Sequence, residues 1–445
     1  MSWKSVVILA IAAAAGWGFA AGEALAQSGQ NEQFVPRLVY RTGPYAPNGI
    51  PFADGYADYL DMLNARDGGI NGVKLTYEEC EFAYNNDRGV ECYERLKTKG
   101  AAFLDSLSTG ITYALLERSA ADKIPLITMG YGRADASYGP VFPYVFPFAT
   151  TYWDAADAMI TYVGQQEGGA AKLKGKRIVL VYLDSAYGKE PIPTLERLAK
   201  EDGYEFEKYA VSPPGIDQKA VWLQIRQKRP NWVFLWGWGV MNSTSIKEAA
   251  AVGFPVDHLI GVWFSGAESD VVPAGAAAKG YKAASFHGVG ADYPVIRDVL
   301  KYVYAKGGGH GTKEEVGQVL YDRGMIAAMY VLEGMRTAQE HFGNKPMTGE
   351  QVQWGLEHLD VTPARLAQLG FEGLAIPLKL SCEDHKGNGN ARIIQWDGQR
   401  WNVVSDWIQP HNDVLREQYK ESALKYAQEK GIKPRDCAAQ SAEAK

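Results

Sequence analysis

Two adjacent hydroxyl side chains, Ser108 and Thr109, stand where a short apolar strand gives way to a helix. The strand is predicted over 101–104 and the helix over 109–121. A helix N-terminus exposes unpaired N–H groups and carries a partial positive charge, so the two hydroxyls and the N–H groups of Thr109 and Gly110 can together hold a carboxylate. A plain helix cap is the alternative, because serine and threonine are favoured at that position. The pair is therefore a candidate anion site.

The other candidate ligand contacts are polar and aromatic side chains in loops or at the ends of predicted strands. Trp238 and Trp263 offer flat faces on which a ligand can stack, and burial between domains is the alternative for both. Tyr131 follows a strand predicted over 124–129, and a surface tyrosine is its alternative. The full set beyond the hydroxyl pair is Tyr45, Asn48, Tyr131, Tyr187, Trp238 and Trp263.

Charged and nucleophilic side chains form no comparable pattern. Arg133 could pair with a carboxylate through two hydrogen bonds, but a solvated loop charge is the favoured interpretation. The seven histidines are scattered and lack metal-binding spacing such as HExxH. No G-x-S-x-G elbow, P-loop or helix-opening G-x-G-x-x-G occurs. A secreted α/β hydrolase is thus a weak rival, and we expect no enzyme activity, cofactor or metal.

The composition is that of an ordinary globular protein with a full core, at 46% hydrophobic and 22% charged residues. The length allows two to three domain-sized units. The net charge of −6 argues against a nucleic-acid partner, which requires a basic face.

The first 26 residues have the three parts of a secretory signal peptide. Lys4 provides the positive start, Val6–Ala15 the apolar core, and Ala24-Leu25-Ala26 the cleavage site before Gln27. A membrane anchor is the alternative, but an apolar core of about 10 residues is too short to span the bilayer. We therefore expect cleavage after Ala26 and a periplasmic protein.

Four cysteines, Cys80, Cys92, Cys382 and Cys437, suit disulfides in an exported chain. They allow three pairings, and the sequence does not choose among them. Proximity along the chain favours Cys80–Cys92 and Cys382–Cys437.

The predicted elements form two successive series in which strands alternate with helices, which indicates two parallel sheets. The first series has strands at 34–40, 74–78, 101–104 and 124–129, and helices at 52–65, 87–99 and 109–121. The second has strands at 177–183, 205–211, 232–236 and 259–264, and helices at 153–165, 192–201, 219–227 and 244–252. Helices follow at 293–304, 317–341 and 349–359, and a hairpin turn is predicted at Asp397-Gly398.

Five stretches together resemble the branched-chain amino-acid-binding family of periplasmic solute-binding proteins. Tyr59–Leu75 (YLDMLNARDGGINGVKL) is similar to its D-x-I-N-x-x-G-G-I-N-G stretch, and 123–127 (KIPLI) to its GIPLIS strand. Asp184–Gly188 resembles its D-x-x-Y-G turn. Residues 247–253 and 395–398 resemble its xxQAxxxG helix and QW-x-x-G hairpin. The five occur in the family's order across the mature chain.

The resemblance implies an α/β type I periplasmic-binding-protein fold, with two Rossmann-like lobes joined by three crossover segments and a ligand in the cleft. It also implies that Tyr131 contacts the ligand and that Tyr187 closes on it from the second lobe. The expected partners are a small-molecule ligand and the membrane permease of an ABC transporter, with the protein a monomer. The expected divisions are the signal peptide 1–26, an N-terminal lobe of 34–148 plus 282–370, a C-terminal lobe of 149–281 plus 371–437, and a tail of 438–445.

Two departures from the family pattern bear on the cysteines and the ligand. The family's first-lobe disulfide would pair Cys80 with a cysteine near Ser108, so Cys92 is the implied substitute. The acidic residue that holds an α-ammonium group in the family is replaced by Phe264-Ser265-Gly266, with Glu268 and Asp270 further on. We therefore expect the ligand to be either a branched-chain amino acid or an aromatic acid. A ligand-sensing module that serves no transporter is the alternative function for the same fold.

Overall fold

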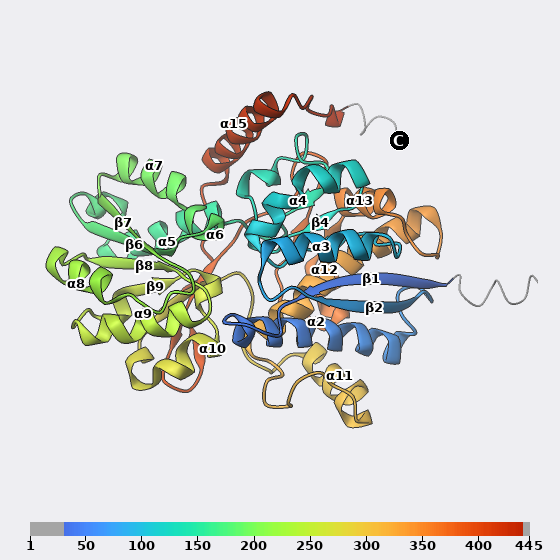
Figure 1. The fold of residues 1–445 in the computed structure, drawn as a ribbon, viewed down its shortest axis with the longest axis horizontal. Helices are drawn as coiled ribbons and strands as arrows, with labels where there is room; N and C mark the ends of the chain where they lie inside the picture. The colour runs from blue at the N-terminus through green and yellow to red at the C-terminus, as the bar shows by residue number, and fades with distance from the viewer. Residues whose placement is uncertain (1–30, 439–445) are drawn as a thin grey trace, which may run out of the picture.

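The computed structural model describes residues 31–438, and two β-sheets, one parallel and one mixed, divide them into two lobes (Figure 1). The first sheet has the order β2-β1-β3-β4-β5 with every neighbouring pair parallel. Its strands are β1 (Glu32–Val39), β2 (Lys74–Glu81), β3 (Leu104–Asp105), β4 (Leu126–Ile127) and β5 (Val145–Phe146). The signal peptide predicted over 1–26 and most of the predicted tail lie outside the described residues.

The second sheet has seven strands in the order β14-β13-β10-β9-β8-β6-β7. The run Ile178–Val181 is fully buried, as expected for a strand that helices cover on both faces. The last two strands form the antiparallel hairpin predicted around Asp397-Gly398. The strands are β6 (Arg177–Leu183), β7 (Glu205–Val211), β8 (Trp232–Trp236), β9 (Leu259–Gly261), β10 (Lys282–Ser285), β13 (Arg392–Trp396) and β14 (Trp401–Val403). The two-lobed α/β fold is therefore confirmed.

Helices flank each sheet and place their N-termini at the carboxyl ends of the strands. In the first lobe α2 packs against α12 and α3 against α4. The first-lobe helices are α2 (Ala46–Asp67), α3 (Asn86–Lys97), α4 (Thr109–Asp122), α11 (Pro294–Tyr302), α12 (Val319–Phe342), α13 (Gly349–Glu357) and α14 (Pro363–Leu369). The second-lobe helices are α5 (Tyr152–Glu167), α6 (Ala186–Lys189), α7 (Ile192–Asp202), α8 (Lys219–Lys228), α9 (Val240–Ala251) and α10 (Glu268–Val271). Within residues 31–438, none of the helices has the length and apolar character needed to cross a membrane.

The chain crosses between the lobes at residues that differ from the predicted ones. We expected 282–370 in the first lobe, but β10 pairs with β9 and β13, so the return follows Ser285. We expected the second lobe to resume at 371, but β12 (Leu378–Lys379) pairs with β11 (Asp360–Val361), and His385 Nδ1 hydrogen-bonds to the Val145 carbonyl of the first lobe. Strand pairing decides both boundaries, because a strand's backbone groups must be satisfied by the sheet it joins.

The C-terminal helix α15 (Asn412–Lys430) lies across both lobes (Figure 1). On the second lobe Gln418 donates to Thr194 Oγ1 at 3.0 Å, and on the first lobe Ser422 donates to Asp135 Oδ2 at 2.6 Å. Between them the Tyr419 ring stacks on Trp153 with centroids 5.2 Å apart. The helix α15, which we expected in the second lobe with the other residues up to 437, thus contacts both lobes.

Both favoured disulfides are present. Cys80–Cys92 joins the end of β2 to α3, and Cys382–Cys437 ties the segment after β12 to the end of the chain. Arg435 adds a hydrogen bond from its N–H to the Pro140 carbonyl. Residues 435–437 are thus fixed to the first lobe.

Candidate functional site

A cavity lies between the lobes at the carboxyl ends of both sheets, where ligands bind in open parallel α/β folds. The free space between its walls is about 390 Å³, which includes space open to solvent. Its lining comes from both lobes and is aromatic apart from one leucine and two hydroxyl residues. The first lobe contributes Tyr40, Phe52, Tyr84, Leu107, Ser108, Thr109 and Tyr131, and the second contributes Tyr152, Tyr187, Trp238 and Phe264.

A strained turn aims the start of α4 at this cavity. Leu107 has a φ of 49°, a conformation that costs free energy for a residue with a Cβ. Its N–H donates to the Tyr131 hydroxyl at 2.8 Å, and Tyr131 in turn donates to the buried Asp105 carboxylate. The hydroxyl of Tyr131 is therefore committed to holding the turn, and only its ring is left to face a ligand.

The hydroxyls of Ser108 and Thr109, which were predicted to hold a carboxylate, lie at the N-terminus of α4. Ser108 is the N-cap residue, yet its side chain makes no capping hydrogen bond. Thr109 Oγ1 accepts the Gly132 N–H at 3.2 Å, which leaves its own proton free to donate. Tyr84 lies by Ser108 and Tyr152 by Thr109, so the hydroxyls gather at the start of the helix. This arrangement can bind an anion through neutral donors and helix N–H groups.

The second lobe contributes aromatic faces. The Tyr187 hydroxyl donates to the Gly237 carbonyl at 2.9 Å, which holds the D-x-x-Y-G turn against the end of β8 and leaves the ring in the cavity wall. Trp238 is 4% exposed, and its indole N–H has no acceptor in the structure. Phe264 packs edge-on against Trp238 with centroids 5.5 Å apart. These rings can cover the apolar part of a ligand.

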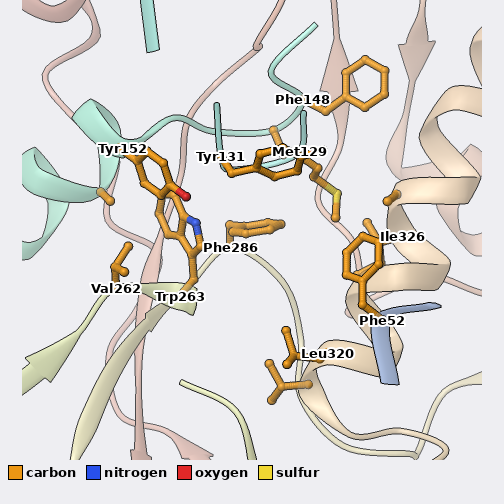
Figure 2. Packing of buried hydrophobic residues seen from close by; sticks show 14 of the residues in the cluster. Phe52, Met129, Tyr131, Phe148, Tyr152, Val262, Trp263, Phe286, Leu320 and Ile326 are labelled. Carbon is orange, nitrogen blue, oxygen red and sulfur yellow. The ribbon is translucent and has the colours of Figure 1, made fainter. Parts of the chain in front are cut away.

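Three predicted contacts do not line the cavity, and two of them, Trp263 and Asn48, bridge the lobes. Trp263 is fully buried, donates across the lobes to the Gly130 carbonyl at 2.7 Å, and stacks on Tyr152 (Figure 2). Asn48, which was expected in a loop, lies on α2 and donates to Asp270 of the second lobe at 3.2 Å. Tyr45 caps α2 and packs on Tyr84.

A third contact between the lobes is made by the buried carboxylate of Glu190, which follows α6. It accepts from the Tyr113 hydroxyl of α4 and from the Ala134 N–H at 3.2 Å, both in the first lobe. Burial raises the pKa of Glu190 to about 7. The lobes are thus held closed partly by a carboxyl group that prefers its neutral form.

Among residues 31–438, no charged side chain lines the cavity. Burial raises the pKa of the Tyr131, Tyr152 and Tyr187 hydroxyls well above their usual value, so these groups stay neutral. Of the two acidic residues considered for an ammonium group, Glu268 accepts the Val319 N–H at 3.0 Å and Asp270 accepts from Asn48 and Asn242. Both are engaged at the contact between the lobes, away from the lining.

Comparison with known proteins identifies the family. The periplasmic binding protein family matches residues 32–400. The chain belongs to this family. No curated protein sequence matches it. A structure described as an ABC transporter permease from the Pseudomonas fluorescens group is 44% identical, with a TM-score of 0.85 and coverage of 92% of this chain and 99% of that one.

Two other solved structures share the fold of this periplasmic binding protein. A branched-chain amino-acid ABC transporter protein from Thermus thermophilus, with bound valine, is 22% identical over 86% of this chain and 99% of that one, with a TM-score of 0.74. A solute-binding protein from R. palustris, in complex with benzoate, is 18% identical over 85% of this chain and 97% of that one, with a TM-score of 0.68. The same fold thus accommodates an amino acid in one protein and an aromatic acid in another.

Five of the eight predicted contacts line the cavity of this binding protein: Ser108, Thr109, Tyr131, Tyr187 and Trp238. Arg133 does not, because its guanidinium pairs with Asp135 through two hydrogen bonds and lies 4.2 Å from the centroid of Tyr426. Tyr40 and Phe264 line the cavity and were missed, although each directly follows a strand or its terminal turn. Ligand contact itself stays a prediction for every one of these residues.

One cluster among the described residues of the binding protein brings three metal-ligating side chains together, Asp58, Asp61 and His310. Asp58 is buried and accepts from the Tyr304 and Tyr321 hydroxyls and pairs with His310 Nδ1, all within 2.9 Å. These hydrogen bonds satisfy the carboxylate and hold the segment before α12 to α2. We therefore assign the cluster a structural role.

Proposed function

We propose that this periplasmic binding protein captures a small carboxylic acid with an apolar or aromatic body and delivers it to the permease of an ABC importer. It acts as a monomer in the periplasm and closes its lobes about the crossovers as a hinge. The observation that carries the proposal is the lining of the cavity. Hydroxyls and helix N–H groups at the start of α4 suit a carboxylate, aromatic rings cover the remainder, and no carboxylate is available for an ammonium group.

Matched pairs of ligands test this proposal directly. 3-Phenylpropionate is phenylalanine without its α-ammonium group, and 4-methylpentanoate is leucine without it. Burying an ammonium group without a counter-charge is costly, so we expect each acid to bind roughly a hundredfold or more tightly than its amino acid. Calorimetric titration of the wild type measures the ratio, and binding should raise the thermal midpoint by mass action. Tighter binding of the amino acid in both pairs would overturn the proposal.

Trp238→Ala should change which acids are preferred. The substitution removes an aromatic wall, so flat acids such as benzoate and 3-phenylpropionate should lose about tenfold in affinity or more, while 4-methylpentanoate loses less. Trp407→Ala, which removes a tryptophan that is 41% exposed and outside the lining, is the matched control. If flat and branched acids lose the same affinity in Trp238→Ala, the Trp238 ring does not discriminate between ligands by their shape.

A further inference from the structure

A buried arginine without an ionic partner lies directly behind the cavity wall. Arg323, at the start of α12, is fully buried. No carboxylate lies within 4.0 Å of its guanidinium among the described residues, whereas Arg37, the other buried arginine among them, pairs with Glu79 at 3.0 Å. An unpaired buried charge is costly, so its retention calls for a compensating anion.

The hydrogen bonds of Arg323 leave one donor unused. Nη1 donates to the Trp263 carbonyl at 2.8 Å, and Nε donates to His287 Nε2 at 3.1 Å. His287 Nδ1 is 2.5 Å from the Gly288 carbonyl, so it carries the proton and leaves Nε2 as the acceptor. Burial lowers the pKa of His287 well below its usual value, which keeps this acceptor neutral. Nη2 has no hydrogen-bond partner.

Only one aromatic ring separates this charge from the cavity. The guanidinium is sandwiched between the rings of Phe264 and Phe286, at 4.9 and 5.0 Å from their centroids. Phe264 is itself part of the lining, beside Trp238 and Tyr152. Phe264 is apolar and screens the charge of Arg323 only weakly. The electrostatic potential of that charge therefore extends into the cavity.

The carboxyl groups around Arg323 form no ion pair with it within 4.0 Å among the described residues. Burial raises the pKa of Asp322 well above its usual value and that of Glu268 to about 7. Burial raises the pKa of Asp270 to about 6, so this carboxyl is ionised at neutral pH and partly offsets the charge of Arg323, while its hydrogen bonds go to two asparagines. Burial also lowers the pKa of Arg323 itself to about 9, and it remains a cation at neutral pH. Arg323 is thus a buried cation that has no ion pair of its own among the described residues and is offset only in part by these neighbours.

We propose that Arg323 is the residue that makes the cleft select anions, its charge acting on a ligand carboxylate from behind Phe264. The inference rests on the proposed function, since it supplies the counter-charge that the hydroxyls of the lining lack. It assigns the ligand class as monoanions whose carboxylate sits within reach of both the start of α4 and the Phe264 wall. Arg323 is a specificity-determining residue in this account and makes no direct contact with the ligand.

The test compares acids with their neutral, nearly isosteric amides. Wild type and Arg323→Met are titrated with 3-phenylpropionate and benzoate, each alongside its primary amide. We expect Arg323→Met to weaken acid binding about 30-fold, the factor for a unit charge several ångströms away at an effective dielectric of about 20, and to leave amide binding within about threefold. The preference for acid over amide should therefore collapse.

Two further variants separate charge from structure. Arg392→Met removes an arginine that donates to the His287 carbonyl at 3.2 Å and lies outside the lining, and it should leave the acid-to-amide ratio unchanged. Arg323→Lys keeps the charge and should retain most of the acid preference, which decides the matter if Arg323→Met does not fold. Equal losses for acid and amide in Arg323→Met, or loss of the acid preference in Arg323→Lys, would overturn the inference. Failure of wild type to bind any acid would instead overturn the proposed function.

Discussion

The double variant Ser108→Ala, Thr109→Ala should bind an acid ligand roughly a thousandfold more weakly than the wild type. Each hydroxyl can donate one hydrogen bond to a carboxylate, and a hydrogen bond to a charged group contributes about 1.5–3 kcal/mol. Thr109→Ala alone should cost about tenfold to a hundredfold. The N–H groups at the start of α4 remain, so binding is weakened without being abolished. Calorimetric titration with 3-phenylpropionate gives the affinities.

The structure allows this loss to be separated from the loss of a helix cap. The Ser108 side chain makes no capping hydrogen bond, so its removal should leave the thermal midpoint almost unchanged. Thr348 caps α13 by accepting the Gln351 N–H, and Thr348→Ala should cost about 1 kcal/mol of stability without affecting binding. Thr109→Ser restores the hydroxyl and should recover most of the affinity. Wild-type affinity in the double variant would show that α4 does not hold the ligand.

Much of the fold could be predicted because the buried strands are unbroken apolar runs with clear ends. The predicted ranges 177–183, 205–211 and 232–236 coincide with β6, β7 and β8. The strands β3 and β4 were predicted too long, since only two residues of each pair with a neighbour. Apolar residues beside them are buried by packing, which a pattern of hydrophobicity cannot distinguish from strand pairing.

The start of α2 could not be predicted, because its glycines and prolines are typical of a loop. The helix begins at Ala46, where a proline is tolerated in the first turn. A Cβ on Gly49 would lie 2.3 Å from the Tyr40 ring, and one on Gly55 would lie 2.0 Å from the Tyr321 carbonyl. These glycines allow α2 to approach β1 and α12 closely, a reason that depends on residues distant in sequence. Because residues before 52 were predicted to form a loop, Asn48 was expected in that loop, whereas it lies on α2.

The residues at the anion-binding end of the cavity could be predicted from the sequence. Fewer of the aromatic residues that form its walls could be predicted. Ser108 and Thr109 follow a strand and open a helix, and this rule of position alone points to the cleft. The same rule applied to Tyr40, which directly follows β1, would have identified a further lining residue. Tyr84 gives no such signal, since it reaches the cavity from a loop where its φ is 58°.

Nothing in the sequence indicated that Arg323 and Glu190, the charged residues proposed to control selectivity and closure, are buried between the lobes. Arg323 lies within a predicted helix and Glu190 beside a predicted turn, both ordinary places for exposed charge. Their importance arises because the opposite lobe covers them: Trp263 accepts from Arg323, while Tyr113 donates to Glu190. Only the relative placement of the two lobes shows that these charges are buried.

Ligand binding should weaken as the pH rises from 5 to 8, because closure buries Glu190. Burial raises the pKa of this carboxyl from 4.5 to about 7 in the closed form. In the open form it loses its first-lobe partners, and we expect its pKa to return toward the ordinary value. A carboxyl with a raised pKa in the closed form favours closure below its open-form pKa. That contribution is lost as the pH rises through about 7.

The size of the effect follows from linkage. For Glu190 alone, the shift from 4.5 to about 7 corresponds to roughly a fifty- to hundredfold weaker closure at pH 8 than at pH 5. Arg133 opposes the rise in its pKa and Asp135 adds to it, while Tyr113 donates to its charged form. Glu268, whose pKa is also raised to about 7, adds to the slope at the other edge of the cleft.

Glu190→Gln isolates this contribution, because its amide cannot ionise. The amide oxygen can still accept the Ala134 N–H, and the NH2 group that replaces the other oxygen can donate to the Tyr113 hydroxyl. At pH 8 the variant should bind roughly fifty- to hundredfold more tightly than the wild type, with a slope against pH that falls by up to about one proton and keeps the share of Glu268. Glu357→Gln, whose partners His385 and Arg435 are fixed to the first lobe, should keep the wild-type slope. An acid that stays ionised over the whole range is the probe, and scattering follows closure through the radius of gyration. If Glu190→Gln retains the full pH dependence, the carboxyl does not ionise on opening, and closure is controlled elsewhere.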